Sequence, residues 1–199
     1  SEAGNDLVLF GSDTQAVPGE DGSYRFTGTK IFTSLAPVWT QLGLHGLDTT
    51  SPDAPKLVYA FVPRSDDVVT RDDWDTLGMR GTQSRTTELH AAKAPAAAVV
   101  RRVDPGPNPD PIVFGIFSVF ELLLASVYTG IAGRALELAV DTVGRRQSKK
   151  TGKAYSQDPD IRWRIAEMAL AYDALGPQLA ALCADVDAQA DHGARWFSL

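Results

Sequence analysis

The chain has 199 residues, 44% of them apolar and 22% charged, and a formal net charge of −6. These values describe a globular protein with one large or two small domains and room for a sizeable core. The negative charge offers no basic surface to nucleic acid, so we expect no nucleic-acid partner. The single cysteine, Cys183, excludes an internal disulfide and is typical of a reducing compartment, so we expect a cytoplasmic protein.

The first half of the chain has the pattern of a β-domain. Short apolar segments separated by turn residues are typical of a small antiparallel barrel or sandwich. We therefore predict a small antiparallel β-barrel domain over residues 1–103. The expected strands are residues 24–27, 30–34, 39–47 and 57–62, with weaker candidates at 68–74 and 86–90.

A proline-rich segment separates this half from the next. Residues 104–111, DPGPNPDP, contain four prolines and a glycine, which neither a helix nor a central strand accommodates. We therefore predict a hinge here. Asp110-Pro111 then combines an N-cap residue with a proline in the first turn, so a long helix is expected to begin there and to reach about Arg146.

Residues 112–199 are predicted to be the helical segment of a second domain. Asp158-Pro159 opens a second helix by the same capping chemistry. Pro177 cannot donate a hydrogen bond to the carbonyl of Asp173, so this helix should be kinked. The predicted fold class is thus α+β, with a small barrel followed by long antiparallel helices of an incomplete four-helix bundle.

The first of these helices is unusually apolar. Residues 112–132 carry one charge, Glu121, over a length that could cross a bilayer of ~30 Å. A carboxylate in mid-span is costly in lipid, so we favour a helix buried inside a bundle and expect no membrane span. Two helices and a small barrel hardly cover it. We expect either partner copies or a longer chain to do so.

Three stretches together resemble motifs of the acyl-CoA dehydrogenase family of flavoproteins. SEAGND, at residues 1–6, is similar to the family's Thr/Ser-Glu-Pro-Gly…Ser-Asp segment. YRFTGTKIFTSLA, at 24–36, is similar to its G-x-K-x-(Trp/Phe)-(Ile/Thr)-(Thr/Ser) strand, and WDTLGMRGTQS, at 74–84, to its Leu-Gly-Met-Arg turn. The resemblance implies the family's middle β-domain and the first part of its C-terminal bundle, with the usual catalytic carboxylate beyond Leu199.

The resemblance implies FAD as the cofactor and a dimer or tetramer formed through the C-terminal helices. Phe32 would pack beside the flavin ring, with Thr33 and Ser34 at its redox edge and the hydroxyl and backbone N–H of Ser34 near N5 and O4. The alternative is that Phe32 belongs to the core and that Thr33 and Ser34 are simply good strand residues. The further implied contacts are Ser1 at the pyrimidine edge and Gly4 and Asn5 at the pyrophosphate, which glycine lets backbone amides approach.

Five further residues are candidates for the site. Some family members carry a catalytic Glu followed by an Arg in the first bundle helix, and Glu121 lies one position, ~100° of helix turn, from the matching place. It is a candidate base or, alternatively, a buried structural acid. Arg145 or Arg146 could make the family's contact with a neighbouring subunit's FAD pyrophosphate, although the phenylalanine of that element is missing. Arg80 and Ser84 are candidates to line the substrate.

The function implied by the resemblance is α,β-dehydrogenation of an acyl-CoA thioester, an oxidation of a CH–CH group in fatty acid metabolism. Because the family's Glu–Arg pair is absent, a flavin-dependent monooxygenase of the same fold is the alternative, and a non-catalytic oligomerisation or assembly fragment is the third possibility. The catalytic base is not identified in this chain. His45, His90 and His192 lack the spacing of metal ligands, so we expect no metal.

Overall fold

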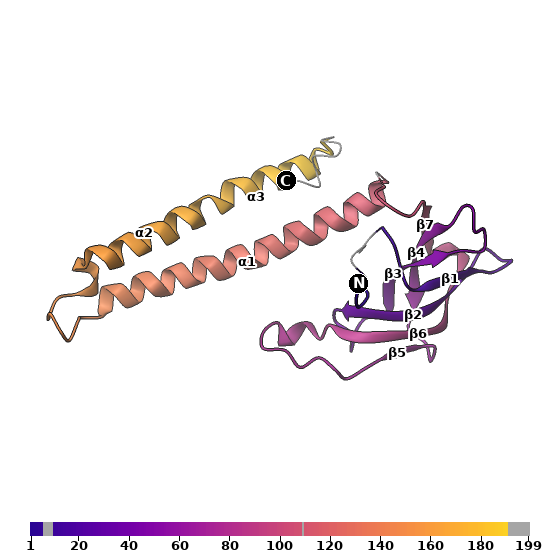
Figure 1. The fold of residues 1–199 in the computed structure, drawn as a ribbon, viewed down its shortest axis with the longest axis horizontal. Helices are drawn as coiled ribbons and strands as arrows, with labels where there is room; N and C mark the ends of the chain where they lie inside the picture. The colour runs from indigo at the N-terminus through magenta and orange to yellow at the C-terminus, as the bar shows by residue number, and fades with distance from the viewer. Residues whose placement is uncertain (6–9, 109, 191–199) are drawn as a thin grey trace. The chain divides into compact units, whose positions relative to one another are not determined.

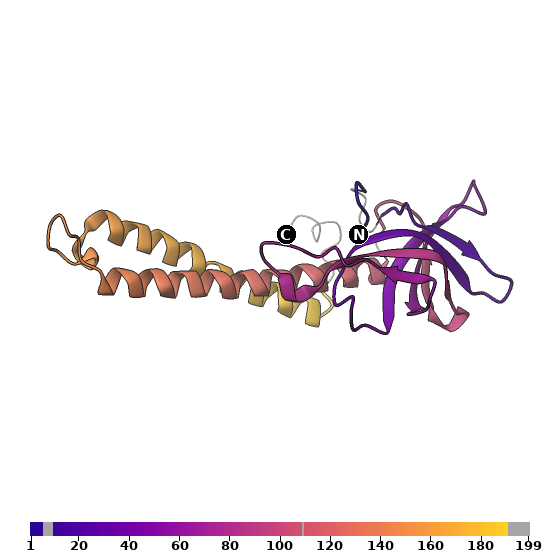
Figure 2. The ribbon, with the colours of Figure 1, turned by 90° about the horizontal axis from the view of Figure 1, so that it is seen from below.

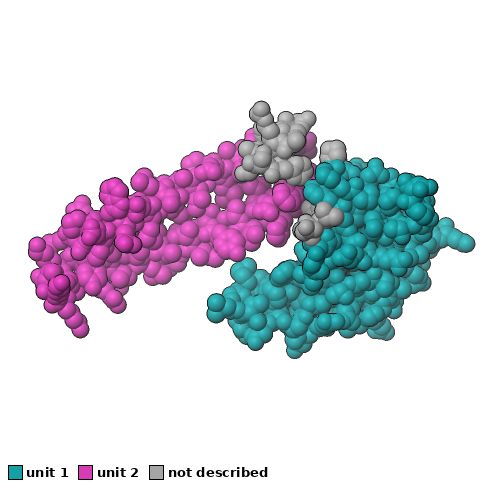
Figure 3. Space-filling view, viewed as in Figure 1, with its two compact units in different colours: residues 1–113 teal, residues 114–199 magenta. Residues whose placement is uncertain are grey.

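The computed structural model describes residues 1–5, 10–108 and 110–190. The chain divides into two compact units, Ser1–Val113 and Phe114–Leu199 (Figure 3). The described strands all lie in the first unit, and the last of them ends at Val103. The first α-helix begins at Pro111, so the proline-rich segment joins sheet to helix.

A mixed sheet of seven strands forms the first unit (Figures 1 and 2). Its strand order is β5-β6-β2-β1-β3-β4-β7. Its strands are β1 Gln15–Pro18, β2 Tyr24–Thr33, β3 Gln41–Asp48, β4 Lys56–Pro63, β5 Val68–Thr70, β6 Arg85–Ala94 and β7 Val99–Val103.

The predicted antiparallel barrel is wrong in two respects. The sheet is open, because its outer strands β5 and β7 each pair with one neighbour among the described residues. It is also mixed, because β1 runs parallel to β3 where Gln15 pairs with Leu47. Closure requires the two outer strands to meet. A pattern of short strands does not encode that meeting.

Strand β2 is one element of ten residues where the sequence predicted two. Gly28 lies in its middle, and a Cβ atom there would come within 2.7 Å of Thr14 Oγ1. The glycine therefore lets the chain that enters β1 pass close to β2, and it does not end the strand. The pairing of β2 with β6 shifts register at Phe26–Gly28 and again at Lys30–Thr33. Both shifts are bulge-like irregularities within one strand.

The core of the first unit is supplied by its strands and, in the smaller cluster, also by Val113 at the start of the first α-helix. Phe26 and Leu89 are fully buried in the larger cluster, and Leu57 in a smaller one. Fully burying a side chain of this size stabilises a fold by ~1.5–3 kcal/mol. The sheet is therefore a rigid platform for the residues at its surface.

The second unit is a helical hairpin. Helix α1, Pro111–Arg145, would be about 52 Å long at the usual rise per residue. Helices α2, Pro159–Asp173, and α3, Leu175–Asp187, run back beside it (Figures 1 and 2). The described 3₁₀ turns of the chain are η1 Arg80–Thr82, η2 Ala96–Ala98 and η3 Tyr155–Gln157.

The predicted helix signals are confirmed. Asp110 Oδ1 accepts a hydrogen bond from the N–H of Ile112 at 3.0 Å. The Asp158 side chain accepts from two N–H groups in the first turn of α2, so both aspartates act as N-caps. Helix α2 ends at Asp173, the residue whose carbonyl Pro177 cannot satisfy.

Helix α1 does not lie buried in a bundle within the described chain. By length and composition it could span a membrane, and only 11% of its most apolar window is buried. The described helices form a hairpin of α1 with α2 and α3, so the predicted incomplete four-helix bundle is not confirmed. The exposed large apolar residues of α1 are Ile116, Phe117, Val119, Phe120, Leu123, Val127, Tyr128, Ile131, Leu138 and Val140.

Candidate functional site

The segment that resembles the family's flavin strand ends in a β-bulge. Between Lys30 and Thr33, β2 has one residue more than the facing part of β6. Phe32 occupies this bulge with a φ of 55°, a left-handed conformation that bulky residues rarely adopt. Phe32 is 61% exposed, and its ring meets Trp74 edge to face with centroids 6.0 Å apart. The interpretation of Phe32 as a core residue is therefore wrong.

Three hydroxyl groups gather directly after the bulge. Ser34 Oγ lies 2.8 Å from Ser84 Oγ, and Ser84 Oγ donates to Thr82 Oγ1 at 2.7 Å. Ser84 is buried, whereas Ser34 is exposed. The arrangement presents one hydroxyl at the surface and supports it with a second from below. The backbone N–H of Ser34 donates to the carbonyl of Phe32 at 2.9 Å, which tightens the turn.

Thr33 points the other way. Thr33 is 7% exposed, and its hydroxyl donates to the carbonyl of Arg85 at 2.6 Å. It also lies 2.7 Å from Thr87 Oγ1. Thr33 therefore joins β2 to β6, and the structure places it away from the exposed hydroxyl of Ser34.

The loop before β6 packs beside this face. Arg80 Nη1 donates to Asp75 Oδ1 at 2.9 Å and to the carbonyl of Thr76 at 2.8 Å, so Arg80 holds its own turn together. Trp74 Nε1 donates to the carbonyl of Met79 at 3.2 Å. Leu35 N–H donates to Thr82 O at 2.7 Å, which ties the end of β2 to the loop.

The N-terminal residues lie against the same end of β2. The carbonyl of Ser1 accepts from the N–H of Ile31 at 3.0 Å. Gly4 has a φ of +78°, and Asn5 Nδ2 donates to a carboxylate oxygen of Glu2 at 2.7 Å. The structure thus brings Ser1 next to the residue that precedes Phe32.

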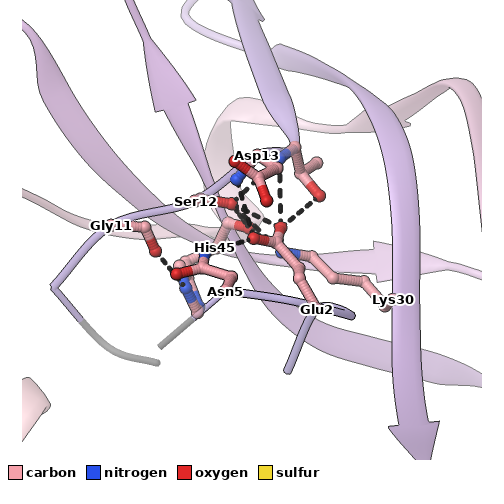
Figure 4. Close-up of polar contacts among 8 residues, drawn as sticks. Glu2, Asn5, Gly11, Ser12, Asp13, Lys30 and His45 are labelled. Atoms are coloured by element: carbon pink, nitrogen blue, oxygen red, sulfur yellow. Dashed lines mark hydrogen bonds and ion pairs between the residues drawn. The ribbon is translucent and has the colours of Figure 1, made fainter. Parts of the chain in front are cut away.

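A buried ion pair fixes this arrangement, and the sequence reasoning missed it. Lys30 Nζ lies 2.5 Å from Glu2 Oε1, and both side chains are 4% exposed (Figure 4). Lys30 Nζ also donates to the carbonyl of His45 at 2.6 Å. A signal was present in the sequence, since Lys30 has the same inward parity in β2 as the core residues Tyr24 and Phe26.

The electrostatics of this cluster follow from its burial. Burial by itself would raise the pKa of Glu2, but hydrogen bonds from Lys30, Ser12 and Thr14 outweigh it and hold the pKa far below the usual range. Burial, assisted by the charge of Lys30, lowers the pKa of His45 to about 4. Glu2 is therefore a carboxylate and His45 a neutral imidazole at neutral pH.

The remaining predicted site residues lie in the second unit. Glu121 is exposed on α1, so its interpretation as a buried structural acid does not hold in this chain. Arg145 pairs with Asp141 one helical turn away, Nη2 to Oδ2 at 2.5 Å. The carbonyl of Arg146 accepts from the N–H of Tyr155 at 2.9 Å, at the base of the loop that follows α1. Among the described residues, no group of three or more His, Cys, Asp or Glu could hold a metal ion.

Comparison with known proteins agrees with the resemblance that the sequence motifs carry. Residues 122–198 match the model of the acyl-CoA dehydrogenase C-terminal domain. A probable acyl-CoA dehydrogenase from Mycobacterium abscessus has the same fold, with a TM-score of 0.76 at 20% identity, over 96% of this chain and 49% of that one. The resemblance drawn from the sequence motifs is thus confirmed.

Two further relatives carry other names. The chain is 35% identical to dibenzothiophene monooxygenase from Rhodococcus erythropolis over 134 residues, which are 63% of this chain and 31% of the relative. The FMN-bound structure of TdsC from Paenibacillus sp. A11-2 has a TM-score of 0.70 at 25% identity, over 87% of this chain and 45% of that one. The chain spans about a third of the length of the curated relative.

Proposed function

We propose that this chain, a member of the acyl-CoA dehydrogenase family, belongs to a flavin-dependent monooxygenase rather than to an acyl-CoA dehydrogenase. The observation that carries the proposal is the 35% identity to dibenzothiophene monooxygenase, which extends over 63% of this chain. The exposed position of Glu121 on α1 agrees, since an exposed carboxylate one position from the family's place is a poor candidate for a dehydrogenase base. Dehydrogenation of an acyl-CoA, and with it a role in fatty acid metabolism, has less support.

The face around the bulge suits a flat, redox-active ring. Phe32 and Trp74 offer an exposed apolar wall, and Ser34 offers a hydroxyl beside it. A reduced flavin bound there would supply two electrons and two protons to O₂ and become oxidised, so that one oxygen atom enters the substrate and the other leaves as water. We assign the ring to this face, with Ser1 at its edge.

Each protein group has a defined task on this face. Because Ser84 Oγ donates its one hydrogen to Thr82, the Ser34 hydroxyl donates to Ser84 and leaves its lone pairs at the surface, where they can accept a hydrogen bond from a ring N–H. Phe32 and Trp74 exclude water from one side of the ring. Thr33 takes no part in binding in this assignment, because its hydroxyl is committed to β6.

We favour FMN over the FAD that the resemblance implies. A relative binds FMN. The side-chain amide of Asn5 is turned toward Glu2, which leaves Gly4 as the remaining group of the predicted pyrophosphate pair. Arg145 and Arg146 lie in the part of the chain that would meet a neighbour's FAD, but Thr151 stands where that element has phenylalanine. The two arginines remain candidates for a phosphate contact.

The substrate class follows from the apolar character of the face. Leu77, which is fully exposed, and Met79, which is half exposed, belong to the same loop as Trp74 and add to its exposed apolar side chains. An aromatic heterocycle matches such a surface, whereas a CoA ester would call for cationic contacts. Arg80, the candidate for that role, is held by Asp75 and Thr76.

The decisive experiment supplies reduced FMN, O₂ and either dibenzothiophene or indole to the full-length protein. Mass spectrometry with ¹⁸O₂ should find one labelled oxygen atom in the product. Ser34→Ala should lower turnover by about tenfold, the worth of one hydrogen bond of ~1.4 kcal/mol. Ser51→Ala, at an exposed turn elsewhere, is the matched control and should leave turnover unchanged. Anaerobic bleaching of bound flavin by an acyl-CoA, without oxygenated product, would instead establish dehydrogenation.

A further inference from the structure

We propose that Glu2 and Lys30 are a positioning pair, which holds residues 1–5 against the end of β2 so that Ser1, Phe32 and Ser34 form one continuous face. The inference rests on the proposed function, since this is the face assigned to the flavin. Neither residue touches that face itself. Each is buried, and each acts through the backbone that it fixes.

The carboxylate of Glu2 is the centre of the contacts (Figure 4). It accepts hydrogen bonds on both oxygens, from three segments of the first unit. Oε1 accepts from Lys30 Nζ at 2.5 Å, Ser12 Oγ at 2.6 Å, Thr14 Oγ1 at 2.6 Å and Thr14 N at 3.0 Å, and Oε2 accepts from Asn5 Nδ2 at 2.7 Å and Asp13 N at 2.7 Å. A carboxylate with so many donors has one geometry, and the chain that carries it is fixed accordingly.

The ammonium group of Lys30 is satisfied in the same way. Besides Glu2, it donates to the carbonyl of His45 in β3 at 2.6 Å and to Ser12 Oγ at 3.2 Å. Its three donors therefore join the N-terminal segment, β2 and β3. Lys30 lies two residues before Phe32, so the pair fixes the strand immediately before the bulge.

The position of residues 1–5 explains why such a device is needed. Strand β1 pairs with β2 only as far as Thr27, opposite Gln15. Beyond that point Ile31 donates its N–H to the carbonyl of Ser1, so the N-terminal segment takes the place that β1 has left. A single backbone hydrogen bond would hold this segment weakly. The buried pair supplies the additional anchor.

A buried pair of charges is a poor choice for stability alone. Its desolvation offsets much of the attraction, and apolar residues of similar volume often stabilise a fold as well. What the pair provides is a single arrangement, because removing one partner leaves the other charge buried without compensation. This accounts for a lysine at an inward-facing position of a central strand.

The test compares charge-removing variants in the full-length protein. Glu2→Gln and Lys30→Met should each raise the dissociation constant of FMN by about tenfold or more, because Ser1, Phe32 and Ser34 would no longer form one continuous face. Flavin fluorescence measures this constant. Each should also speed hydrogen exchange of the Ile31 amide. The double variant should recover part of both losses, because no unpaired charge remains. Glu2→Asp provides a milder variant should the others fail to fold.

Tyr24→Phe is the matched control. It removes the buried hydrogen bond from Tyr24 Oη to Asp48 Oδ2, at 2.9 Å, from the opposite end of the same strand. It should lower thermal stability without changing the affinity for FMN or the exchange of the Ile31 amide. Equal effects of Tyr24→Phe and Glu2→Gln on these two measurements would overturn the proposal, since they would reflect general loss of stability.

The outcome separates this inference from the flavin assignment. If the wild-type protein binds neither FMN nor FAD, the proposed function fails, and the exchange of the Ile31 amide still decides whether the pair anchors residues 1–5. If FMN binds and Glu2→Gln changes neither its affinity nor the Ile31 exchange, the positioning pair is refuted and the flavin assignment stands.

Discussion

The two units of this chain cover their apolar side chains to very different extents. In the sheet, Phe26 and Leu57 are fully buried, whereas on α1 Phe120 is 59% and Leu123 is 64% exposed. The strands bury their residues against one another, but α1 has only α2 and α3 beside it in the described chain. The first unit therefore covers most of its own apolar side chains, and the hairpin presents an apolar surface of the kind that usually marks an interface.

This difference bears on function because the candidate residues are divided between the units. The first unit, with its buried core, holds Ser1, Phe32, Ser34 and Ser84 in place. Arg145 and Arg146 lie on the hairpin, where assembly would decide what they meet. A dimer or tetramer through α1 remains our prediction.

The largest expected effect is in the sheet. Phe26→Ala should lower the free energy of unfolding by about 3–5 kcal/mol, because it removes a fully buried ring from a close-packed core. Denaturant unfolding, followed by hydrogen exchange of β2 and β4 peptides, measures it. Leu123→Ala, on the exposed face of α1, is the matched substitution and should change these peptides by less than about 0.5 kcal/mol. Similar losses from both would mean that the two units unfold together.

A second effect depends on pH. His45 has a pKa of about 4 in the folded protein against an unfolded value of 6.5, so between these values the unfolded state binds more protons. The stability of the sheet should be complete above pH 6.5 and should fall by about 3 kcal/mol as the pH drops toward 4. The variant His45→Gln should not show this loss of stability between pH 6.5 and 4.

The loss of stability that remains in the His45→Gln variant should begin at a lower pH. Glu2 has a depressed pKa, so its contribution is present above its unfolded value of 4.5 and is lost as the pH falls below it. Peptides from α1 serve as the internal control and should show no slope between pH 6.5 and 4. A wild-type sheet whose stability is flat across that window would contradict a neutral, buried His45.

A smaller effect concerns the hairpin. Asp158→Ala removes the N-cap of α2 and should lower the local free energy of opening by about 1 kcal/mol, seen as faster exchange in the first turn of the helix. Asp158→Asn keeps a capping oxygen and should restore protection. Exchange in β2 should be unchanged in both variants. A loss of protection in β2 would show that the units are coupled.

The smallest expected change in stability comes with a change in assembly. Leu123→Glu places a charge on the exposed face of α1 and should alter unfolding of the sheet by less than about 0.5 kcal/mol. It should nevertheless reduce the oligomer mass measured by light scattering and loosen bound flavin. Glu137→Gln, on the polar part of the same helix, is the control. A wild-type protein that is monomeric at micromolar concentration and retains flavin would refute the link between assembly and cofactor.

Part of the candidate site could be predicted from the sequence. The motif placed Phe32 and Ser34 together, and both are exposed, because a strand motif is local and its residues stay together. The other two predicted site residues of this region, Thr33 and Ser84, are buried. The bulge at Phe32 reverses the alternation, so Thr33 turns inward, and Ser84 lies buried beneath Ser34. A bulge depends on the partner strand, which the motif does not contain.

The sequence by itself determined the elements whose causes are local. Asp110 and Asp158 begin helices because each caps N–H groups two or three residues away, and Pro177 ends α2 because it lacks one N–H. Only the tertiary structure decided the open, mixed sheet, the union of two predicted strands into β2, and the pairing of Glu2 with Lys30. Each of these depends on groups distant in the chain that meet only after folding, and burial then gives their contacts their strength.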